Sequence, residues 1–367
     1  MRLGMISFTA GGTALLGSLA VRLEAKGIAC HGYVPKRYWT DEMGAGGIEI
    51  SGDGGAGRFA ERMFASKTPM LFVGAAGIAV RAIAPWVRDK MSDPPVLVMD
   101  EAGRFVIPIL SGHVGGANEL ARLIGDCCGA VPVITTATDV NHVFAVDVFA
   151  ARNELAITDR EAARHIAMDL LEGREVGFFD RCSAEMFGRG GDGRIIDGRL
   201  PAGWLPAGCA AKPCERNICI SVEADPGIPG ENLVLVPRAV VLGIGCRRGI
   251  SVEALRGFVE ETLKGAGIRP EAVACLASID VKRDERAITE LAAGMNWKFI
   301  TYSVEELERV PGEFSESAFV RQTVGVGCVC ERAAMAAAPG GRLLFGKQAG
   351  SGATVAAALR PIRLRAE

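Results

Sequence analysis

Apolar residues in the first part of the chain form short runs that alternate with stretches of helical spacing. Residues 1–8, MRLGMISF, are an apolar run that leads into glycines, after which Leu15, Leu19 and Leu23 recur at helical spacing as far as Gly27. The same order of apolar run, glycine turn and helical pattern returns further along the chain. This alternation predicts an α/β fold whose N-terminal part is a doubly wound, mainly parallel sheet.

A different pattern occupies residues 94–110, PPVLVMDEAGRFVIPIL, where two apolar runs flank residues 101–103. It predicts a β-hairpin. The second strand of this hairpin leads into a glycine turn and a helix, and residues 130–139, AVPVITTATD, supply the next strand. Ligands usually bind in the loops at the carboxyl ends of such strands.

Changes in this pattern predict three domains. Residues 1–150 are expected to form an N-terminal α/β domain with glycine-rich strand–helix turns. Between residues 151 and 236 the periodic signals weaken and turn residues abound, which predicts a small, irregular middle domain. Pro237 precedes a new apolar run, AVVLGIGCRRG, so residues 237–367 are expected to form a separate C-terminal α/β domain.

Composition narrows the classes of function. The formal net charge is −2 and aromatic residues make up 6% of the chain, so no nucleic-acid-binding surface is expected. No apolar stretch approaches the roughly 18 residues that span a bilayer, and a secretory signal is lacking. Eleven cysteines, an odd number without zinc-site spacing, favour structural thiols in a reduced, cytoplasmic protein with no metal of its own.

Three strand–helix turns of the N-terminal domain are rich in glycine. Glycine lets a ligand approach the backbone, and a helix N-terminus offers N–H groups and a positive dipole end, so such a surface favours anions. The chain carries neither a phosphate-binding loop nor a well-placed dinucleotide fingerprint. Arg81 interrupts an apolar segment and therefore needs an acidic partner or a ligand. The glycines concerned are Gly11, Gly12, Gly74, Gly77, Gly112, Gly115 and Gly116.

The third of these turns, in residues 107–125, IPILSGHVGGANELARLIG, concentrates polar side chains. His113 stands at the expected start of a helix, where the positive dipole end favours a neutral imidazole that can act as a base near pH 7. Ser111 is the natural N-cap of this helix. Asn118 and Glu119 fall near the same end. Together they predict a catalytic or binding loop.

A second cluster is expected at strand ends of the C-terminal domain. Asp280, Lys282 and Glu285 follow an apolar strand in ASIDVKRDE, Glu331 begins a helix in GVGCVCERAAM, and Lys347 ends a strand in LLFGKQ. Charges at strand ends are often only solvated loops. Several at one sheet edge favour a binding cleft.

Seven segments, spread over both ends of the chain, carry specific motifs. They read GAAGIAVRAIAP, DPPVLVMDEAGRFVIPILSGHVGGANELA, PVITTATDVN, GIGCRRG, ASIDVKRDE, SAFVRQTVGVGCVCERAA and LLFGKQ. Together they resemble the CbiG family of the anaerobic cobalamin pathway, and only residues from about 180 to 236 carry no such motif. His142 stands where a small residue is expected, as a local variant or as a second ionisable group near the site.

The resemblance implies a reaction. The family is held to open the ring-A acetate lactone of cobalt-precorrin-5A with water and to release acetaldehyde, giving cobalt-precorrin-5B. Cobalt would arrive inside the substrate, so no cofactor is expected. A corrinoid precursor is a polycarboxylate, which suits glycine-rich helix N-termini and scattered Arg and Lys side chains. Neighbouring enzymes of the pathway and a second copy of the chain are candidate partners.

The chemistry of the residues suggests their roles. His113 would activate water toward the lactone carbonyl, and backbone N–H groups of the 115–116 turn would stabilise the oxyanion. Glu119, Glu285 or Glu331 would handle a later proton transfer. Substrate binding is expected from Gly11, Gly12, Gly74, Gly77, Arg81, Ser111, Gly112, Gly115, Gly116, Asn118, Thr135, Thr136, Asp280, Lys282 and Lys347.

Two other functions remain open. A non-catalytic carrier of corrinoid intermediates would bind the substrate but release no acetaldehyde. An unrelated nucleotide-binding α/β enzyme would be stabilised against heat by a nucleotide and not by a corrinoid.

Overall fold

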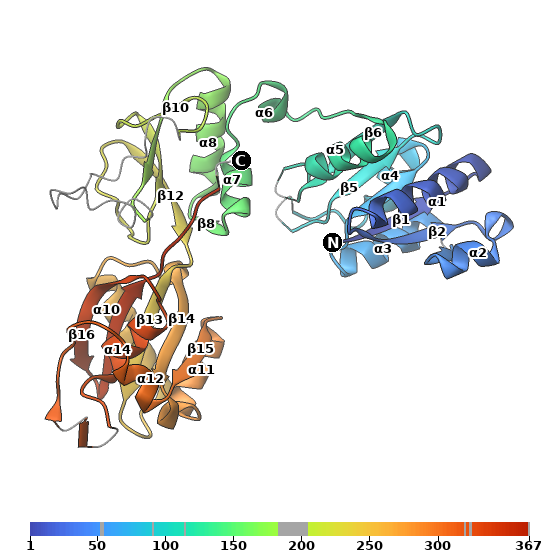
Figure 1. Ribbon diagram of the computed structural model, residues 1–367. Helices are drawn as coiled ribbons and strands as arrows, with labels where there is room; N and C mark the ends of the chain where they lie inside the picture. The colour runs from blue at the N-terminus through green and yellow to red at the C-terminus, as the bar shows by residue number, and fades with distance from the viewer. Residues whose placement is uncertain are drawn as a thin grey trace. The chain divides into compact units, whose positions relative to one another are not determined.

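The computed structural model describes residues 1–51, 55–89, 92–113, 115–182, 205–318, 321–322 and 325–365. The chain divides into two compact units, residues 1–142 and 143–367. One sheet belongs to the first unit and two belong to the second (Figure 1). Within the described residues, no helix is both long enough and apolar enough to cross a membrane.

The first unit is built on a seven-stranded sheet in the order β3-β2-β1-β4-β5-β6-β7. Its strands are β1 (Arg2–Ser7), β2 (Ala29–Val34), β3 (Ile48–Ile50), β4 (Met70–Val73), β5 (Val96–Met99), β6 (Phe105–Leu110) and β7 (Val131–Pro132). Its helices are α1 (Ala10–Glu24), η1 (Lys36–Tyr38), α2 (Asp41–Ala45), α3 (Gly55–Ala65), α4 (Ala76–Ile83), α5 (Ala117–Cys128) and α6 (Ala137–Val140). Neighbouring strands are parallel except β5 and β6.

Helices cover both faces of this sheet. On β4, Leu71 and Val73 join an apolar core with α1 and α5. The alternate residues Met70 and Phe72 point to the other face and join a core with α3 and α4. Because the central strands are buried on both sides, their sequences are continuous apolar runs. The predicted doubly wound sheet is confirmed.

The β5–β6 hairpin, predicted from residues 94–110, reverses the chain direction within the sheet. Val96 pairs with Leu110, and Met99 pairs with Val106. The loop after β6 therefore lies at the edge where β5 begins, whereas the turns that follow β1 and β4 lie at the opposite edge. The three glycine-rich turns therefore lie at two opposite edges of the sheet.

The second unit begins with a five-stranded sheet in the order β10-β9-β11-β12-β8, in which only the β12–β8 pair is antiparallel. The strands are β8 (Leu155–Ile157), β9 (Val176–Asp180), β10 (Cys209–Ala210), β11 (Arg216–Ile220) and β12 (Glu231–Pro237), with helices α7 (Val146–Arg152) and α8 (Arg160–Leu171). This part is more regular than its sequence predicted. Residues 183–204, which hold much of the turn-rich sequence, lie outside the described residues.

The C-terminal sheet has the order β15-β14-β13-β17-β16. Its strands are β13 (Val240–Cys246), β14 (Val273–Ile279), β15 (Lys298–Tyr302), β16 (Arg342–Gly350) and β17 (Ala353–Leu359). Its helices are α10 (Val252–Gly265), η3 (Pro270–Ala272), η4 (Asp280–Lys282), α11 (Arg286–Gly294), α12 (Val304–Glu308) and α14 (Val329–Ala336). Helix α12 begins with a capping box between Ser303 and Glu306.

The two sheets of the second unit share a core. Val222, Val234 and Val236 pack with apolar residues of the C-terminal sheet. The final segment returns to the middle part, where Ile362 and Leu364 pack against its core. The middle and C-terminal parts therefore form one body.

Candidate active site

The polar residues of the first unit meet in two loops that follow neighbouring strands. His113 follows β6, and residues 133–139 follow β7. Because β6 and β7 are parallel, their carboxyl ends meet at the same edge of the sheet. In α/β folds, ligands bind outside the carboxyl ends of the strands. For β6 and β7, this end of the sheet is where the His113 loop and residues 133–139 lie.

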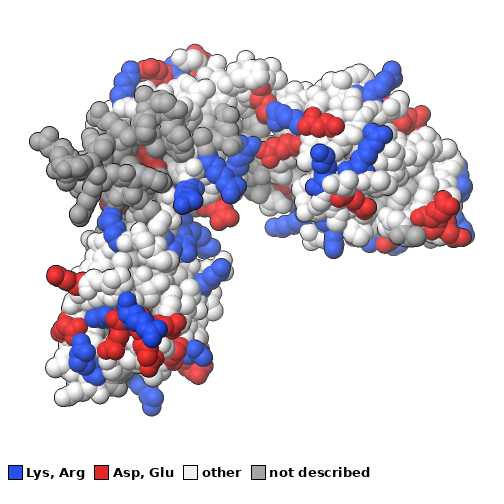
Figure 2. Space-filling model, in the orientation of Figure 1, with Lys and Arg blue, Asp and Glu red and all other residues white. Residues whose placement is uncertain are grey.

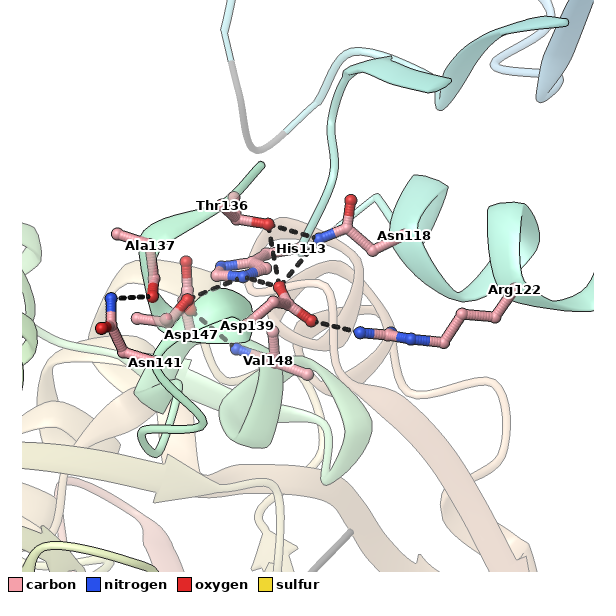
Figure 3. A network of polar contacts seen from close by, with 10 residues as sticks. His113, Asn118, Arg122, Thr136, Ala137, Asp139, Asn141, Asp147 and Val148 are labelled. Carbon is pink, nitrogen blue, oxygen red and sulfur yellow. Dashed lines mark hydrogen bonds and ion pairs between the residues drawn. The ribbon is translucent and has the colours of Figure 1, made fainter. Parts of the chain in front are cut away.

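Asp139 is the centre of this cluster. Its Oδ2 lies 2.7 Å from His113 Nε2, 2.9 Å from Asn118 Nδ2 and 2.9 Å from Thr136 Oγ1. Its Oδ1 accepts a hydrogen bond from Arg122 Nη2 at 2.6 Å. Figure 3 shows these four side chains turned toward the Asp139 carboxylate. The cluster therefore joins the loop after β6, helix α5 and the segment that enters α6.

The pKa of Asp139 is strongly lowered. Burial by itself would raise this pKa, but hydrogen bonds from Arg122, Thr136 and His113 outweigh it and lower the pKa from 3.8 to about 2. Asp139 is therefore ionised at any pH at which the protein is expected to work.

This pKa shift predicts an acid-sensitive contribution to stability. A depressed folded-state pKa stabilises the protein fully above the unfolded value near 4, by about 2 kcal/mol here, and the contribution is lost as pH falls toward 2. The free energy of unfolding of Asp139→Asn should therefore approach that of the unmodified protein between about pH 5 and pH 3. A constant difference for Asp139→Asn over this pH range would contradict this.

Asn118 ties the histidine loop to helix α5. Its backbone N–H donates to Gly112 O at 2.9 Å, and its side-chain Nδ2 reaches Thr136 Oγ1 at 2.7 Å. A Cβ at Gly112 would lie only 2.8 Å from Asn118 Oδ1, so the close approach requires glycine. Arg122, one turn further along α5, lies on the same helix face.

The start of helix α5 differs from what the sequence predicted. Helix α5 has Gly116 at its N-cap, in the left-handed region at φ 84°, and Ser111 instead donates its hydroxyl to Asp93 O at 2.8 Å. His113 therefore precedes the helix, and the dipole argument does not apply to it. The Gly116 amide, expected to bind an oxyanion, already donates to His113 O at 2.9 Å.

Gly115 is required by packing within the loop itself. A Cβ at this position would lie 2.4 Å from Ser111 Cβ and 2.7 Å from Ser111 O. Gly115→Ala is therefore expected to lower the free energy of unfolding by about 1–3 kcal/mol. Gly11→Ala is the matched control, because nothing lies within 4 Å of its added Cβ and alanine favours helix, so it should be neutral or slightly stabilising. Thermal unfolding of both variants checks this, and equal stability would contradict it.

The other predicted glycines lie in the turns after β1 and β4, at the opposite edge of the sheet, where Thr9 forms the N-cap of α1. Thr9 caps α1 by accepting from Gly12 N at 3.0 Å and donates to Glu101 Oε2 at 2.7 Å. Gly74 has φ 152°, outside the range that most side chains adopt comfortably. Arg81 was expected to need an acidic partner or a ligand; its side chain is exposed and donates to the carbonyl of Gly77 at 3.2 Å, and binding of a ligand stays a prediction.

The predicted charged residues of the C-terminal sheet fall into two groups. At the carboxyl ends of β13 and β14, Lys282 Nζ lies 2.9 Å from Glu285 Oε2, and Gly249 N donates to Glu285 Oε1 at 3.2 Å. The Lys282 ammonium is the main cause that lowers the pKa of Glu285. Asp280 begins η4, the short helix that also contains Lys282, and pairs with Arg283 at 2.7 Å.

Glu331 forms a separate buried group. Its carboxylate accepts from Ser315 N at 2.6 Å, Ser315 Oγ at 2.8 Å and Lys347 N at 2.7 Å. Burial by itself would raise its pKa, but these hydrogen bonds give a net lowering. Lys347 lies within β16, not at the end of a strand as predicted. Glu285 and Glu331 are thus both held ionised, which makes them poor proton donors.

Other predicted residues lie near the Asp139 cluster at the surface. Glu119 and Thr135 are exposed, and His142 is exposed with left-handed backbone at φ 53°. Sequence reasoning missed two members of the cluster, Asp139 and Arg122. Thr138, whose Oγ1 lies 2.9 Å from His113 Nε2, was missed as well.

Two further features are the surface charges and the cysteines. Figure 2 shows acidic and basic side chains interspersed on the visible face of each unit. The eleven cysteines are free thiols. In the part of the chain that the structure describes, no group of three or more His, Cys, Asp or Glu side chains is placed to hold a metal ion.

Two segments of the chain match known families. Residues 58–139 match the family described as cobalamin synthesis G N-terminal, and residues 240–358 match cobalamin synthesis G C-terminus. The cobalt-precorrin-5A hydrolase of Salmonella typhimurium is 36% identical over 335 residues, which is 90% of each chain. The chain belongs to the CbiG family. This confirms the resemblance found in the sequence motifs.

Two further comparisons concern a second curated hydrolase and a solved structure. The cobalt-precorrin-5A hydrolase of Priestia megaterium is 30% identical over 82% of this chain and 80% of that protein. A crystal structure of a putative cobalamin biosynthesis protein G homolog from Sulfolobus solfataricus is 19% identical, with a TM-score of 0.38 over 98% of this chain and 97% of that one. The N-terminal CbiG match contains the whole Asp139 cluster, and the C-terminal match contains Glu285 and Glu331.

Proposed function

We propose that this chain is a cobalt-precorrin-5A hydrolase that opens the lactone of its substrate with water and releases acetaldehyde, giving cobalt-precorrin-5B. The observation that carries the proposal is the 36% identity, over 90% of the chain, to a hydrolase of that name. The cluster around His113 and Asp139 supplies a histidine beside an ionised carboxylate, which suits activation of water.

The proposed mechanism begins with lactone hydrolysis. His113 takes a proton from water as the oxygen attacks the lactone carbonyl, and the imidazolium returns this proton to the departing oxygen as the acyl C–O bond breaks, which leaves a carboxylate and an alcohol. The amide of Gly115 is assigned to the oxyanion, in place of the engaged Gly116 amide. A carboxyl group then moves the proton of this alcohol to the macrocycle carbon as the bond between that carbon and the two-carbon fragment breaks, and the fragment leaves as acetaldehyde. Glu119 is favoured for this step because Glu285 and Glu331 are held ionised by their hydrogen bonds.

Binding is proposed to rest on the carboxylates of the corrinoid. Exposed Arg81 and half-buried Lys347 offer charge to such groups, and Lys282 could do so while paired with Glu285. Cobalt belongs to the substrate, so the proposal gives the protein no cofactor. A cytoplasmic location, a homodimer and contacts with neighbouring pathway enzymes are further parts of the proposal.

The test is an assay of acetaldehyde release. Purified protein is incubated with cobalt-precorrin-5A, and acetaldehyde is measured against time. Release in proportion to protein concentration is the expected result. Corrinoid binding without acetaldehyde would favour the carrier, and thermal stabilisation by a nucleotide but not by the corrinoid would favour the nucleotide-binding enzyme.

A further inference from the structure

Asp139 lies against His113 in a setting that fixes both side chains. We propose that Asp139 is a positioning residue that holds the His113 imidazole in the tautomer with its proton on Nε2. This inference rests on the proposed function, since it concerns the histidine assigned there as the base. Asp139 acts through His113 and is not itself assigned a contact with the substrate.

The tautomer follows from the charge of Asp139. Its Oδ2 lies 2.7 Å from His113 Nε2, and an ionised carboxylate has no proton to donate. The short contact is a hydrogen bond only if Nε2 carries the proton. In the neutral ring Nδ1 is then the atom that accepts a proton, so the tautomer decides which nitrogen can act as a base.

Asp139 can fix the orientation of the imidazole because other hydrogen bonds fix the Asp139 carboxylate itself. Asn118 and Thr136 donate to the same Oδ2, while Arg122 holds Oδ1. Thr138 Oγ1 lies 2.9 Å from the same histidine nitrogen, Nε2. Thr138 and Asp139, two partners of Nε2, thus lie in one short segment, and two residues of α5 hold the Asp139 carboxylate from its other side (Figure 3).

The environment of Asp139 argues against a role as the base. Its pKa of about 2 makes it a weak proton acceptor, and Oδ2 already accepts three hydrogen bonds. A fixed negative charge beside the imidazole would instead stabilise the positive charge that develops on the ring when it takes a proton from water. This is the division of labour between histidine and carboxylate in other hydrolases.

Because three donors converge on Asp139 Oδ2, substitution by asparagine and by alanine separates loss of the charge from loss of the hydrogen-bond acceptor. In Asp139→Asn, three donors favour the amide oxygen at the Oδ2 position, so the tautomer is kept while the charge is lost. The amide nitrogen then faces Arg122, whose side chain is 50% exposed and can move away. Asp139→Ala removes both the charge and the acceptor.

The experiment compares kinetics with ¹⁵N NMR of the histidine rings. Spectra of the unmodified protein, Asp139→Asn and Asp139→Ala are recorded without substrate at about pH 8.5, above the usual imidazole pKa of about 6.5. His113→Gln identifies the His113 signal among the four histidines. The unmodified protein and Asp139→Asn should show one tautomer with the proton on Nε2, and Asp139→Ala should show a mixture.

Kinetics should follow the same order. We expect kcat to fall by about 10²–10⁴-fold in Asp139→Ala and by less in Asp139→Asn, with KM nearly unchanged in both. Asp126→Ala removes an exposed carboxylate of α5 and should match the unmodified protein in both measurements. Such a split between kcat and KM is not expected from a general loss of folding.

The outcomes separate this inference from the proposed function. If the unmodified protein releases no acetaldehyde, the proposed function fails, and the catalytic part of the inference fails with it. If it is active but Asp139→Ala keeps kcat within about threefold, only the inference is overturned. A single Nε2–H tautomer in Asp139→Ala would overturn it as well.

Discussion

His113→Ala is expected to lower the rate of acetaldehyde release from cobalt-precorrin-5A by about 10²–10⁴-fold, the usual effect of removing a positioned acid or base. The fold should survive, because the side chain lies at a sheet edge and belongs to no apolar core. Corrinoid binding should also persist, since the proposed carboxylate contacts lie elsewhere. The measurement is kcat at saturating substrate, with corrinoid binding and thermal unfolding as checks on the fold.

A second histidine provides the control for this variant. His142 is exposed in the same unit, and its backbone at φ 53° suits asparagine, so His142→Asn changes an imidazole with little strain. We expect this variant to turn over substrate normally. Near-normal turnover by His113→Ala would remove His113 from the mechanism and leave the loop a role in packing and binding.

The histidine loop shows how far the sequence could lead. Its strand–turn–helix context and its polar composition were sufficient to select His113, Asn118 and Thr136, which the structure brings together. Asp139 and Arg122 were missed because each is unremarkable in its own segment. Only the parallel pairing of β6 with β7 places the end of the TTATD motif beside the histidine, and pairing is not visible in local spacing.

The direction of strand β6 also could not be inferred from local spacing. The hairpin in residues 94–110 was predicted correctly, but its reversal of the chain moves the third glycine turn to the other edge of the sheet. Tertiary packing decided the strand direction, not local propensity.

The regularity of the middle part was underestimated for another reason. Helix α8 has a readable start, since Asp159 caps it by accepting from the amides of residues 161 and 162, but the turn-rich sequence further on obscured the pattern.

Glu331→Ala is expected to have the largest effect on stability, lowering the free energy of unfolding by about 3–5 kcal/mol. Three donors from Ser315 and Lys347 converge on this carboxylate, whose residue is only 3% exposed. A buried donor left without an acceptor costs about 1–3 kcal/mol, and partial relaxation of the site reduces the sum. The free energy of unfolding of Glu331→Gln should lie between those of the unmodified protein and Glu331→Ala, because the glutamine amide nitrogen would face one of the donors.

Chemical denaturation of the full chain measures this effect, with Glu290→Ala as the matched control. Glu290 pairs with Arg286 on the surface of α11, where both side chains are largely exposed, so its loss should change stability by no more than about 0.5 kcal/mol. Equal stability of the two variants would show that the Glu331 carboxylate does not hold α14, β16 and the loop at Ser315 together. If stability were kept while acetaldehyde release was lost, Glu331 would act in the proton transfer that its sequence position predicted. A loss of stability at near-normal kcat, measured on the folded fraction, would place Glu331 in the architecture of the C-terminal sheet and leave the chemistry to the residues around His113.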